Sequence, residues 1–479
     1  MLRRTKIVAT LGPASSSEDA LGRLIDAGID VVRMNFSHGN AEEHAERAER
    51  VRALARSVGR PVGVMADLQG PKIRVGKFEH GKVTLKQGSP FVLDAECGLG
   101  DSFRVGLDYR ELPNDVTAGD VLLLDDGRIV LLVEKVKDAQ IFTRVEQGGL
   151  LSNNKGINRR GGGLSAPALT EKDLGDIKSA AMFKADFLAV SFPRSGADMS
   201  YARDLLQEAG GKSLLVAKIE RAEAIPALDE ILDASDAIMV ARGDLAVEMG
   251  DATVPALQKR MIRLARAKYK LVITATQMME SMISNPIPTR AEVSDVANAV
   301  LDGTDAVMLS AETAVGQYPV ETVEAMARVC IEAERNMEST LDRDLMDRVF
   351  TRIDQSVAMA AAFSAYHLKV KAIGALTQSG STALWISRIN PGVPIYALTP
   401  VVETRRRLTM FSGVHPYNLR ESSDDRDVVL HAAEQELLRR GAVHPGDLVV
   451  LTIGELVGKS GQTNTLKIIR VGEKHKSEG

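Results

Sequence analysis

The chain has 479 residues, of which 44% are hydrophobic and 26% are charged, and its net charge is −4. This balance argues against a dedicated nucleic-acid-binding protein, which would carry a basic stripe, and an aromatic content of 4% is too low for base-stacking surfaces. Two cysteines predict a reducing, cytoplasmic location, and no apolar run reaches the roughly 18 residues that a membrane span needs.

Eight short apolar or β-branched runs, each ending in polar residues, predict eight strands. They are Lys6–Leu11, Val31–Ser37, Val62–Leu68, Phe187–Phe192, Leu214–Glu220, Ala237–Asp244, Leu271–Gln277 and Ala306–Glu312. Amphipathic helical stretches lie between most of them, among them Glu42–Val58, Val254–Tyr269 and Ala291–Leu301. Eight such units favour an α/β fold with a closed (β/α)8 TIM barrel over an open doubly wound sheet. We assign this catalytic barrel to residues 1–69 and 165–338.

The pattern changes between residues 70 and 164. Lys82–Lys86 alternates with period two, and short strands are predicted at Val121–Leu124, Ile129–Val133 and Ile141–Val145, with a turn at Asp125-Asp126-Gly127. These features predict an inserted all-β domain, a small β-barrel, in the loop after the third strand. Because active sites of TIM barrels lie at that face, the insert is expected to act as a lid.

Residues 339–479 predict a separate C-terminal α/β domain. Its strands are expected at Ala372–Leu376, Ile395–Leu398, Leu448–Ile453 and Thr465–Val471, with a helix at Asp427–Arg440. The segment Thr377–Thr382 lies between a strand and the expected helix Ala383–Ile389. Hydroxyl and amide groups at a helix start form an anion cradle, although a plain helix cap without a ligand also fits. The candidate residues are Thr377, Ser379, Ser381 and Thr382.

Polar residues also recur two apart at the ends of four barrel strands, so that each set is expected to share a face. The sets are Arg33, Asn35 and Ser37; Lys218 and Glu220; Arg242 and Asp244; and Thr274 and Thr276. Charged groups inside a barrel are costly without partners, which predicts that they lie at the open mouth. Any one Lys–Glu or Arg–Asp pair alone would be interpreted as a structural ion pair, but polar sets at the ends of four strands favour a functional site.

The chemistry of this set points to a metal and a phosphoryl group. Glu220 and Asp244 offer hard oxygen ligands that suit Mg²⁺ or Mn²⁺. Lys218 and Arg33 are cations expected to face the same space, so the ligand should be anionic. Gly243-Asp244-Leu245 is expected to open a short helix whose free N–H groups hold a carboxylate or phosphate.

Seven motifs, in order and at the expected strand ends, identify a resemblance to the pyruvate kinase family that covers nearly the whole chain. They are Lys6–Pro13, Arg33–Gly39, Asp67–Arg74, Lys218–Glu220, Ala241–Leu245, Thr274–Met278 and Met308–Thr313. The resemblance implies transfer of the phosphoryl group of phosphoenolpyruvate to ADP, giving pyruvate and ATP, and it implies a homotetramer. No nucleic acid or membrane partner is expected.

The resemblance also implies residue roles. Glu220 and Asp244 would bind the divalent metal, and Lys218 and Arg33 would contact the phosphoryl group. The substrate carboxylate would be held by Gly243, Asp244 and Thr276, and Thr276 and Ser310 would belong to a proton relay. The nucleotide would contact Asn35, His38, Arg74 and Lys155. Asp126 would approach the nucleotide's metal, although Asp-Asp-Gly is also an ordinary turn.

The chain departs from the family pattern at a monovalent-cation site. Many family members carry Glu where this chain has Lys72 and Thr where it has Leu68, and those members need K⁺. The implied site is Asn35, Ser37, Asp67 and Leu68. Because a lysine ammonium can supply the charge of the ion, we predict activity without added K⁺.

In the family, the segment Thr377–Thr382 binds a phosphorylated effector, which implies a sugar phosphate or AMP here. The segment Gly461–Thr465 resembles the loop that closes over such an effector. Arg405–Arg407 either adds charge there or is a solvated helix face, and we favour the second interpretation. Two alternatives to the kinase remain open, a metal-dependent pyruvate aldolase or lyase on the same barrel and a non-catalytic sugar-phosphate sensor.

Overall fold

The computed structural model describes residues 2–337, 349–420, 423, 425–454 and 462–473. Eight parallel strands close into a barrel in the order β1-β18-β17-β16-β15-β14-β3-β2. These strands are β1 (Lys6–Thr10), β2 (Val31–Asn35), β3 (Gly63–Asp67), β14 (Phe187–Val190), β15 (Leu214–Ile219), β16 (Ala237–Ala241), β17 (Leu271–Ala275) and β18 (Ala306–Leu309). The predicted TIM barrel is confirmed. All eight predicted strands are present, but each ends earlier than predicted.

The early strand ends have a local cause, since the residues that follow bend into loops and helix starts. Arg242 already begins helix α7 (Arg242–Met249), and Thr276 and Gln277 have φ values of 68° and 54°. Positive φ is strained for a β-branched residue such as Thr276, and backbone of this kind is typical of functional sites. The strand pairs predicted at Arg242 and Asp244 and at Thr274 and Thr276 therefore do not share strand faces, and that interpretation is wrong.

Helices cover the outside of the barrel. The longer ones are α1 (Glu18–Ala27), α2 (Ala41–Val58), α4 (Glu171–Met182), α5 (Gly196–Glu208), α6 (Leu228–Ala234), α8 (Val254–Ala267), α9 (Arg290–Leu301) and α11 (Pro319–Arg335), with the single turn α10 at Ala311–Ala314. Ser17, Asn40, Thr170, Ser195 and Thr289 cap helices with side-chain oxygens that accept backbone N–H groups. No helix in the described ranges is both long and apolar enough to span a membrane.

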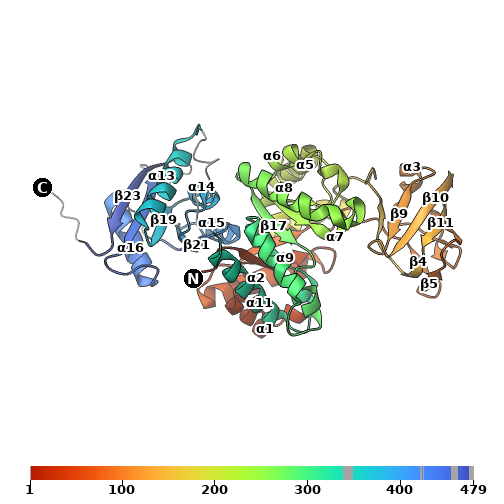
Figure 1. Cartoon of the computed structure of the whole chain (residues 1–479), viewed down its shortest axis with the longest axis horizontal. Coiled ribbons are helices and arrows are strands. Elements are labelled where there is room, and N and C mark those ends of the chain that lie inside the picture. Colours follow the sequence, from red (N-terminus) through yellow and green to blue (C-terminus); the bar gives the residue numbers. More distant parts are fainter. Residues whose placement is uncertain (1, 338–348, 421–422, 424, 455–461, 474–479) are drawn as a thin grey trace.

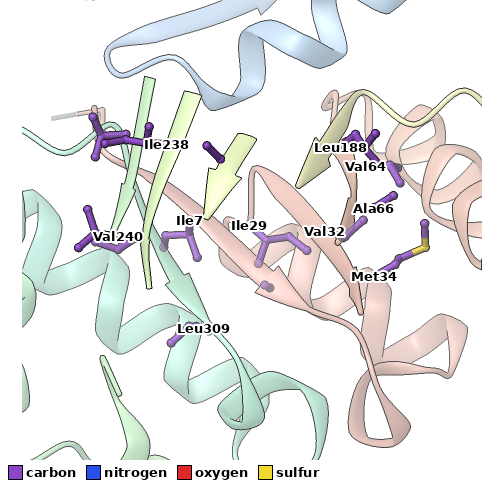
Figure 2. Packing of buried hydrophobic residues seen from close by; sticks show 14 of the residues in the cluster. Ile7, Ile29, Val32, Met34, Val64, Ala66, Leu188, Ile238, Val240 and Leu309 are labelled. Carbon is purple, nitrogen blue, oxygen red and sulfur yellow. The ribbon is translucent and has the colours of Figure 1, made fainter. Parts of the chain in front are cut away.

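Alternate residues of the barrel strands belong to two separate apolar cores. Ile7, Val32, Val64 and Leu188 pack with the surrounding helices in one cluster, part of which Figure 2 shows. The next residues along the strands pack in a second cluster with the C-terminal domain. They include Val8, Val31, Met65, Phe187, Met239 and Ile273. The barrel interior is therefore continuous with the core of the C-terminal domain.

The insert after β3 is an all-β domain with its own apolar core. Its main sheet has the order β13-β9-β10-β11-β6-β8. The strands are β4 (Lys77–Phe78), β5 (Lys82–Leu85), β6 (Pro90–Asp94), β7 (Leu99–Gly100), β8 (Arg104–Val105), β9 (Val121–Leu124), β10 (Ile129–Lys137), β11 (Gln140–Gln147), β12 (Gly149–Ser152) and β13 (Ile157–Arg159), with helix α3 at Leu112–Asp115. The all-β character of the insert is as predicted. Beside the main sheet, β4 pairs with β7 and β5 pairs with β12, and the small β-barrel stays a prediction.

The C-terminal domain has a five-stranded sheet in the order β21-β20-β19-β22-β23, of which only β23 is antiparallel to its neighbour. Its elements are α13 (Ile353–Leu368), β19 (Ala372–Leu376), α14 (Ser381–Ile389), β20 (Ile395–Leu398), α15 (Val402–Arg407), β21 (Val414–Tyr417), α16 (Arg426–Arg439), β22 (Leu448–Gly454) and β23 (Thr463–Arg470). Figure 1 shows this domain and the lid at opposite ends of the barrel. The C-terminal domain thus lies at the end of the barrel opposite the insert.

Aspartates at the amino-terminal foot of every second strand hold the barrel and its partner domain together. The carboxylates of Asp30, Asp186, Asp236 and Asp305 accept the N–H groups of Ile7, Val64, Leu215 and Val272, each on the neighbouring strand, over 2.8–2.9 Å. Asp186 and Asp305 are also ion-paired with Arg406 and Arg388 of the C-terminal domain. The interpretation of Arg405–Arg407 as a solvated helix face is therefore wrong for Arg406.

The Arg388–Asp305 pair gives a stability prediction. Both side chains are almost fully buried, and Arg388 Nη1 lies 2.8 Å from Asp305 Oδ2. Because Arg388→Ala leaves a buried carboxylate without its partner, we expect a loss of about 3–5 kcal/mol in the free energy of unfolding. Urea denaturation measures it. The exposed pair of Arg335 and Glu332 gives the control, since Arg335→Ala should cost about 0–1 kcal/mol. Equal losses in both variants would contradict the prediction.

Candidate active site

Asp67 lies at the centre of a buried charge network at the carboxyl end of the barrel. One of its oxygens is 2.5 Å from Arg33 Nε, and the other is 3.2 Å from Lys218 Nζ. Lys218 Nζ also lies 3.0 Å from Glu220 Oε1. The predicted cluster of Arg33, Lys218 and Glu220 therefore exists, and Asp67, predicted only as part of a cation site, joins its members.

Two hydroxyl groups that the sequence analysis did not identify complete this network. Lys218 Nζ donates to Ser191 Oγ over 2.8 Å, and Ser191 Oγ donates to the Leu68 carbonyl. Arg33 Nη1 donates to Thr10 Oγ1 over 3.1 Å. Both hydroxyls belong to residues at barrel strand ends, so their position after an apolar run was a signal that sequence reasoning could have used.

The surroundings shift the pKa values of the network residues in opposite directions. Burial disfavours the charge of Lys218, but Asp67 and Glu220 outweigh it, so the pKa of Lys218 is raised. Burial also raises the pKa of Glu220; Lys218 opposes this effect, whereas the Asp244 carboxylate adds to it. The pKa of Asp67 is lowered, since Arg33 and Lys218 overcome the effect of its burial. The site therefore holds lysine charged and places a second carboxylate near Glu220.

Helix α7 presents Gly243 and Asp244 beside the end of β17. The Gly243 N–H donates to Thr276 Oγ1 over 3.0 Å, and the Thr276 hydroxyl donates to the Ala275 carbonyl. The prediction that a short helix opens at this point is confirmed. Arg242 points elsewhere, because its guanidinium binds Asp295 and the carbonyl groups of Ala275 and Thr276. Thr274 is fully buried and bonds to Thr304.

Lys72, in the first lid linker, is paired with the metal-site candidate Asp244, with Nζ 3.1 Å from Oδ1. We expected its charge beside Asn35, Ser37 and Asp67 instead. The Asn35 side-chain oxygen accepts the Ser37 N–H, Asp67 is occupied by Arg33 and Lys218, and Leu68 is buried. The expected position of the Lys72 ammonium is therefore wrong, because the linker directs the side chain across the mouth to α7.

The four predicted nucleotide residues form two separate pairs. Arg74 and Lys155 lie together in the lid, where Arg74 donates to the Asn154 carbonyl and Lys155 pairs with Asp125. Asn35 is the last residue of β2, and the exposed His38 follows at the barrel mouth, where the His38 carbonyl accepts a hydrogen bond from His44. Within the described ranges, no hydrogen bond or ion pair joins the two groups.

A cleft of about 770 Å³ separates the lid from the barrel mouth. Asp126 and Arg128 line it from the lid, and Gly243, Asp244 and Gln277 line it from the barrel. The cleft has the size of a small-ligand site. The candidate metal ligand Asp244 and the lid turn that contains Asp126 therefore face the same cleft.

Comparison with known proteins decides the family. A family model described as pyruvate kinase, barrel domain, matches residues 2–323, and one described as pyruvate kinase, alpha/beta domain, matches residues 355–469. The chain belongs to the pyruvate kinase family. It is 54% identical to pyruvate kinase II of Salmonella typhimurium over 98% of this chain and 99% of that protein. It is 55% identical to a pyruvate kinase of Haemophilus influenzae, over 95% and 96% of the two chains.

Membership of the pyruvate kinase family confirms the enzyme class, a phosphotransferase. A pyruvate kinase of Mycobacterium tuberculosis is 42% identical over 99% of both chains. These matches give no support to the aldolase alternative. The non-catalytic alternative would predict loss of Lys218 or of a metal carboxylate, whereas Lys218, Glu220 and Asp244 are all present at one mouth.

Ser310, predicted to belong to the proton relay, and the predicted effector segment of the C-terminal domain are the remaining candidate residues. Ser310 precedes α10 and its N–H donates to Glu312 over 2.6 Å. In the C-terminal domain, Thr377 Oγ1 accepts the Gly380 N–H, and the Ser379 and Ser381 hydroxyls are 3.1 Å apart. Thr382 contacts Thr463, within the segment predicted to close over an effector; Gly461 of that segment lies outside the described residues. Thr377 and Ser379 therefore lie in the loop before α14, whereas Ser381 and the buried Thr382 begin that helix.

The carboxylates of Glu220 and Asp244 fit a divalent cation. The Asp244 charge reaches Glu220 strongly enough to raise its pKa, and a cation between them would relieve that repulsion. Within the ranges described, no group of three or more His, Cys, Asp and Glu side chains is arranged to hold a metal. A two-carboxylate site would leave positions for substrate oxygens and water, as Mg²⁺ prefers.

Asp67 provides a prediction for the network. Asp67→Asn leaves Arg33 and Lys218 without a shared counter-charge in a buried site, so we expect a loss of about 3–5 kcal/mol in the free energy of unfolding. Urea denaturation of Asp67→Asn, Arg33→Met and the double variant completes a double-mutant cycle. The loss in free energy of unfolding of the double variant should be smaller than the sum of the losses of the two single variants. Additive losses would show that the Arg33–Asp67 pair has no coupling.

Proposed function

We propose that the chain transfers the phosphoryl group of phosphoenolpyruvate to ADP, giving pyruvate and ATP. The observation that carries the proposal is the position of Lys218, held between Asp67 and Glu220 beside Arg33 at the lid-covered mouth. Phosphoryl transfer depends mainly on positioning and charge neutralisation, which such an arrangement of fixed cations supplies.

Lys218 and Arg33 would contact the phosphoryl oxygens. The Lys218 ammonium now faces Ser191, Asp67 and Glu220, so a phosphoryl oxygen would replace one of these acceptors. Asp67 would keep both cations in place, since its ion pairs reach Arg33 and Lys218 together. The charge that develops on the transferred group would then be offset without movement of the barrel strands.

Glu220 and Asp244 would hold Mg²⁺ or Mn²⁺. The ion would supply charge neutralisation at the phosphate oxygens. To take part, Asp244 would release Lys72, with which it pairs over 3.1 Å. Glu220 is buried, so this part of the site is shielded from bulk water.

The substrate carboxylate would lie at the start of α7, near Gly243, Asp244 and Thr276. N–H groups at a helix start favour an anion there, and the Gly243 N–H, which now donates to Thr276 Oγ1, would donate to the carboxylate instead. The Thr276 hydroxyl now donates to Ala275, so a proton relay through Thr276 and Ser310 to the enolate carbon would require that hydroxyl to turn. Such a relay also needs water, because a hydroxyl alone has no suitable pKa.

The nucleotide would lie between the lid and the barrel mouth, next to the cleft of about 770 Å³, whose lining includes Asp126 but none of the four predicted nucleotide residues. Arg74 and Lys155 would contact it from the lid, and Asn35 and His38 from the mouth. Closure of the lid would bring the two pairs together and would exclude water, which would otherwise accept the phosphoryl group. Asp126 lines this cleft and would approach the nucleotide's metal.

The C-terminal loop of Thr377, Ser379, Ser381 and Thr382 would bind a phosphorylated effector such as a sugar phosphate or AMP. The Ser379 and Ser381 hydroxyls meet at the start of α14, where an anion is favoured, whereas the buried Thr382 hydroxyl bonds to Thr463. A homotetramer and a cytoplasmic location complete the proposal; the first comes from the family and the second from the low cysteine content.

Replacement of Lys218 tests the proposed reaction. Lys218→Met removes the charge that faces the phosphoryl group, so kcat should fall by about 10²–10³-fold. A coupled assay with phosphoenolpyruvate and ADP, read as ATP formed, measures it. Lys259→Met is the control, because Lys259 on α8 is largely exposed and pairs with Asp302 at the end of α9. Unchanged turnover in Lys218→Met would contradict the assignment.

Lys72 gives a second test. Because Lys72 brings a fixed ammonium to the barrel mouth at the position where K⁺-dependent family members carry Glu, replacing K⁺ with a large organic cation at fixed ionic strength should change turnover by less than about twofold. Lys72→Glu removes that charge, and its turnover should become dependent on K⁺. Strong activation of the unmodified chain by K⁺ would refute the idea.

A further inference from the structure

Glu248 is a buried carboxylate on α7 that the proposed reaction does not use. Its side chain is 5% exposed, and no ion pair reaches it in the described part of the chain. Oε2 accepts the Ala222 N–H over 2.9 Å, and Oε1 accepts Asn158 Nδ2 over 3.3 Å. Burial raises the pKa of Glu248 to about 7. A buried carboxylate held only by neutral donors is costly, which suggests a task beyond packing.

Through its two donors, Glu248 on α7 is connected to two other segments, the loop after β15 and strand β13. Ala222 is two residues beyond Glu220, and Asp244 is one helical turn before Glu248 on the same helix. Glu248 therefore joins the loop of one candidate metal ligand to the helix of the other. Asn158 belongs to β13, so the same carboxylate also holds the returning lid strand.

The lid linker beyond β13 is anchored to the same part of the barrel. The Gly161 N–H donates to the Glu248 carbonyl over 3.0 Å, and the Gly163 N–H donates to Glu223. Arg221 Nη1 donates to the Leu164 carbonyl over 3.2 Å. Since Lys72 of the first linker pairs with Asp244, both lid linkers attach to α7.

We propose that Glu248 is a positioning residue that fixes the separation of Glu220 and Asp244 by bonding the Ala222 N–H from α7. The inference rests on the proposed function, because it treats these two carboxylates as the divalent-metal ligands. Groups that orient metal ligands from behind typically change metal affinity by about 10–100-fold when they are removed.

Binding of Mn²⁺ alone to the full-length chain tests the inference, with free Mn²⁺ followed by electron paramagnetic resonance. Glu248→Ala should weaken Mn²⁺ binding by about 10–100-fold. Glu248→Gln should stay within about threefold of the unmodified chain, because its carbonyl still accepts the Ala222 N–H and Asn158 can turn its amide. If Glu248→Ala does not fold, Glu248→Asp serves, since a side chain shorter by one methylene should also weaken binding by about tenfold.

Two controls separate positioning from general loss of structure. Glu434→Ala removes a carboxylate of equal exposure, 5%, that accepts the Gly472 N–H in the C-terminal domain, and it should leave Mn²⁺ affinity unchanged. Asn158→Ala removes only the lid contact and should stay within about threefold, because the Ala222 bond remains. Circular dichroism establishes that each variant is folded.

The outcomes distinguish this inference from the proposed function. Full Mn²⁺ affinity in folded Glu248→Ala or Glu248→Asp would overturn the inference alone, provided that Glu220→Gln weakens binding. Equal weakening in Glu434→Ala would also overturn it, because the effect would then be nonspecific. Failure of the unmodified chain to bind Mn²⁺, or full binding by Glu220→Gln, would overturn the metal site and the inference together.

Discussion

The arrangement of the mouth depends on one buried carboxylate, Asp67, which is shared by two cations. Without it, Arg33 and Lys218 would repel each other in a space that water barely reaches. With it, the two cations lie on either side of one carboxylate at the carboxyl end of the barrel. The barrel provides the rigidity for this arrangement, since Arg33 and Asp67 lie on the neighbouring strands β2 and β3, whose register is fixed by the packed core.

Much of the fold could be predicted because its signals are local and repeated. The eight apolar runs, the capped helices and strands such as Val121–Leu124 and Ala372–Leu376 appear where the pattern places them. The short lid strands, β4, β7 and β8, carry too few residues to show a period. The ends of the barrel strands were predicted too late for another reason. The alternating pattern of polar residues continues past the last paired residue, but the backbone leaves the sheet at Arg242 and Thr276.

The charged residues of the site could be predicted from the sequence, but the contacts that they make could not. Sequence motifs indicated Lys218, Glu220 and Asp244, because such residue types at strand ends have few structural uses. They could not indicate that Lys72 reaches Asp244 across the mouth, or that Ser191 accepts from Lys218. Those contacts depend on how the lid linker crosses the barrel and on side-chain directions, which are tertiary properties without a one-dimensional signature. The same holds for Arg406, whose partner Asp186 is 220 positions away.

The aspartates at the foot of the barrel have a consequence for how the protein can be divided. Asp30 and Asp236 find their arginines within the barrel, whereas Asp186 and Asp305 find theirs in the following domain. A fragment cut after α11 would remove the arginine partners of Asp186 and Asp305 and would expose to water the apolar strand residues that pack against the C-terminal domain. The stability of the barrel therefore depends on its C-terminal partner, and an unrelated domain in that place would need arginines that reach the starts of β14 and β18.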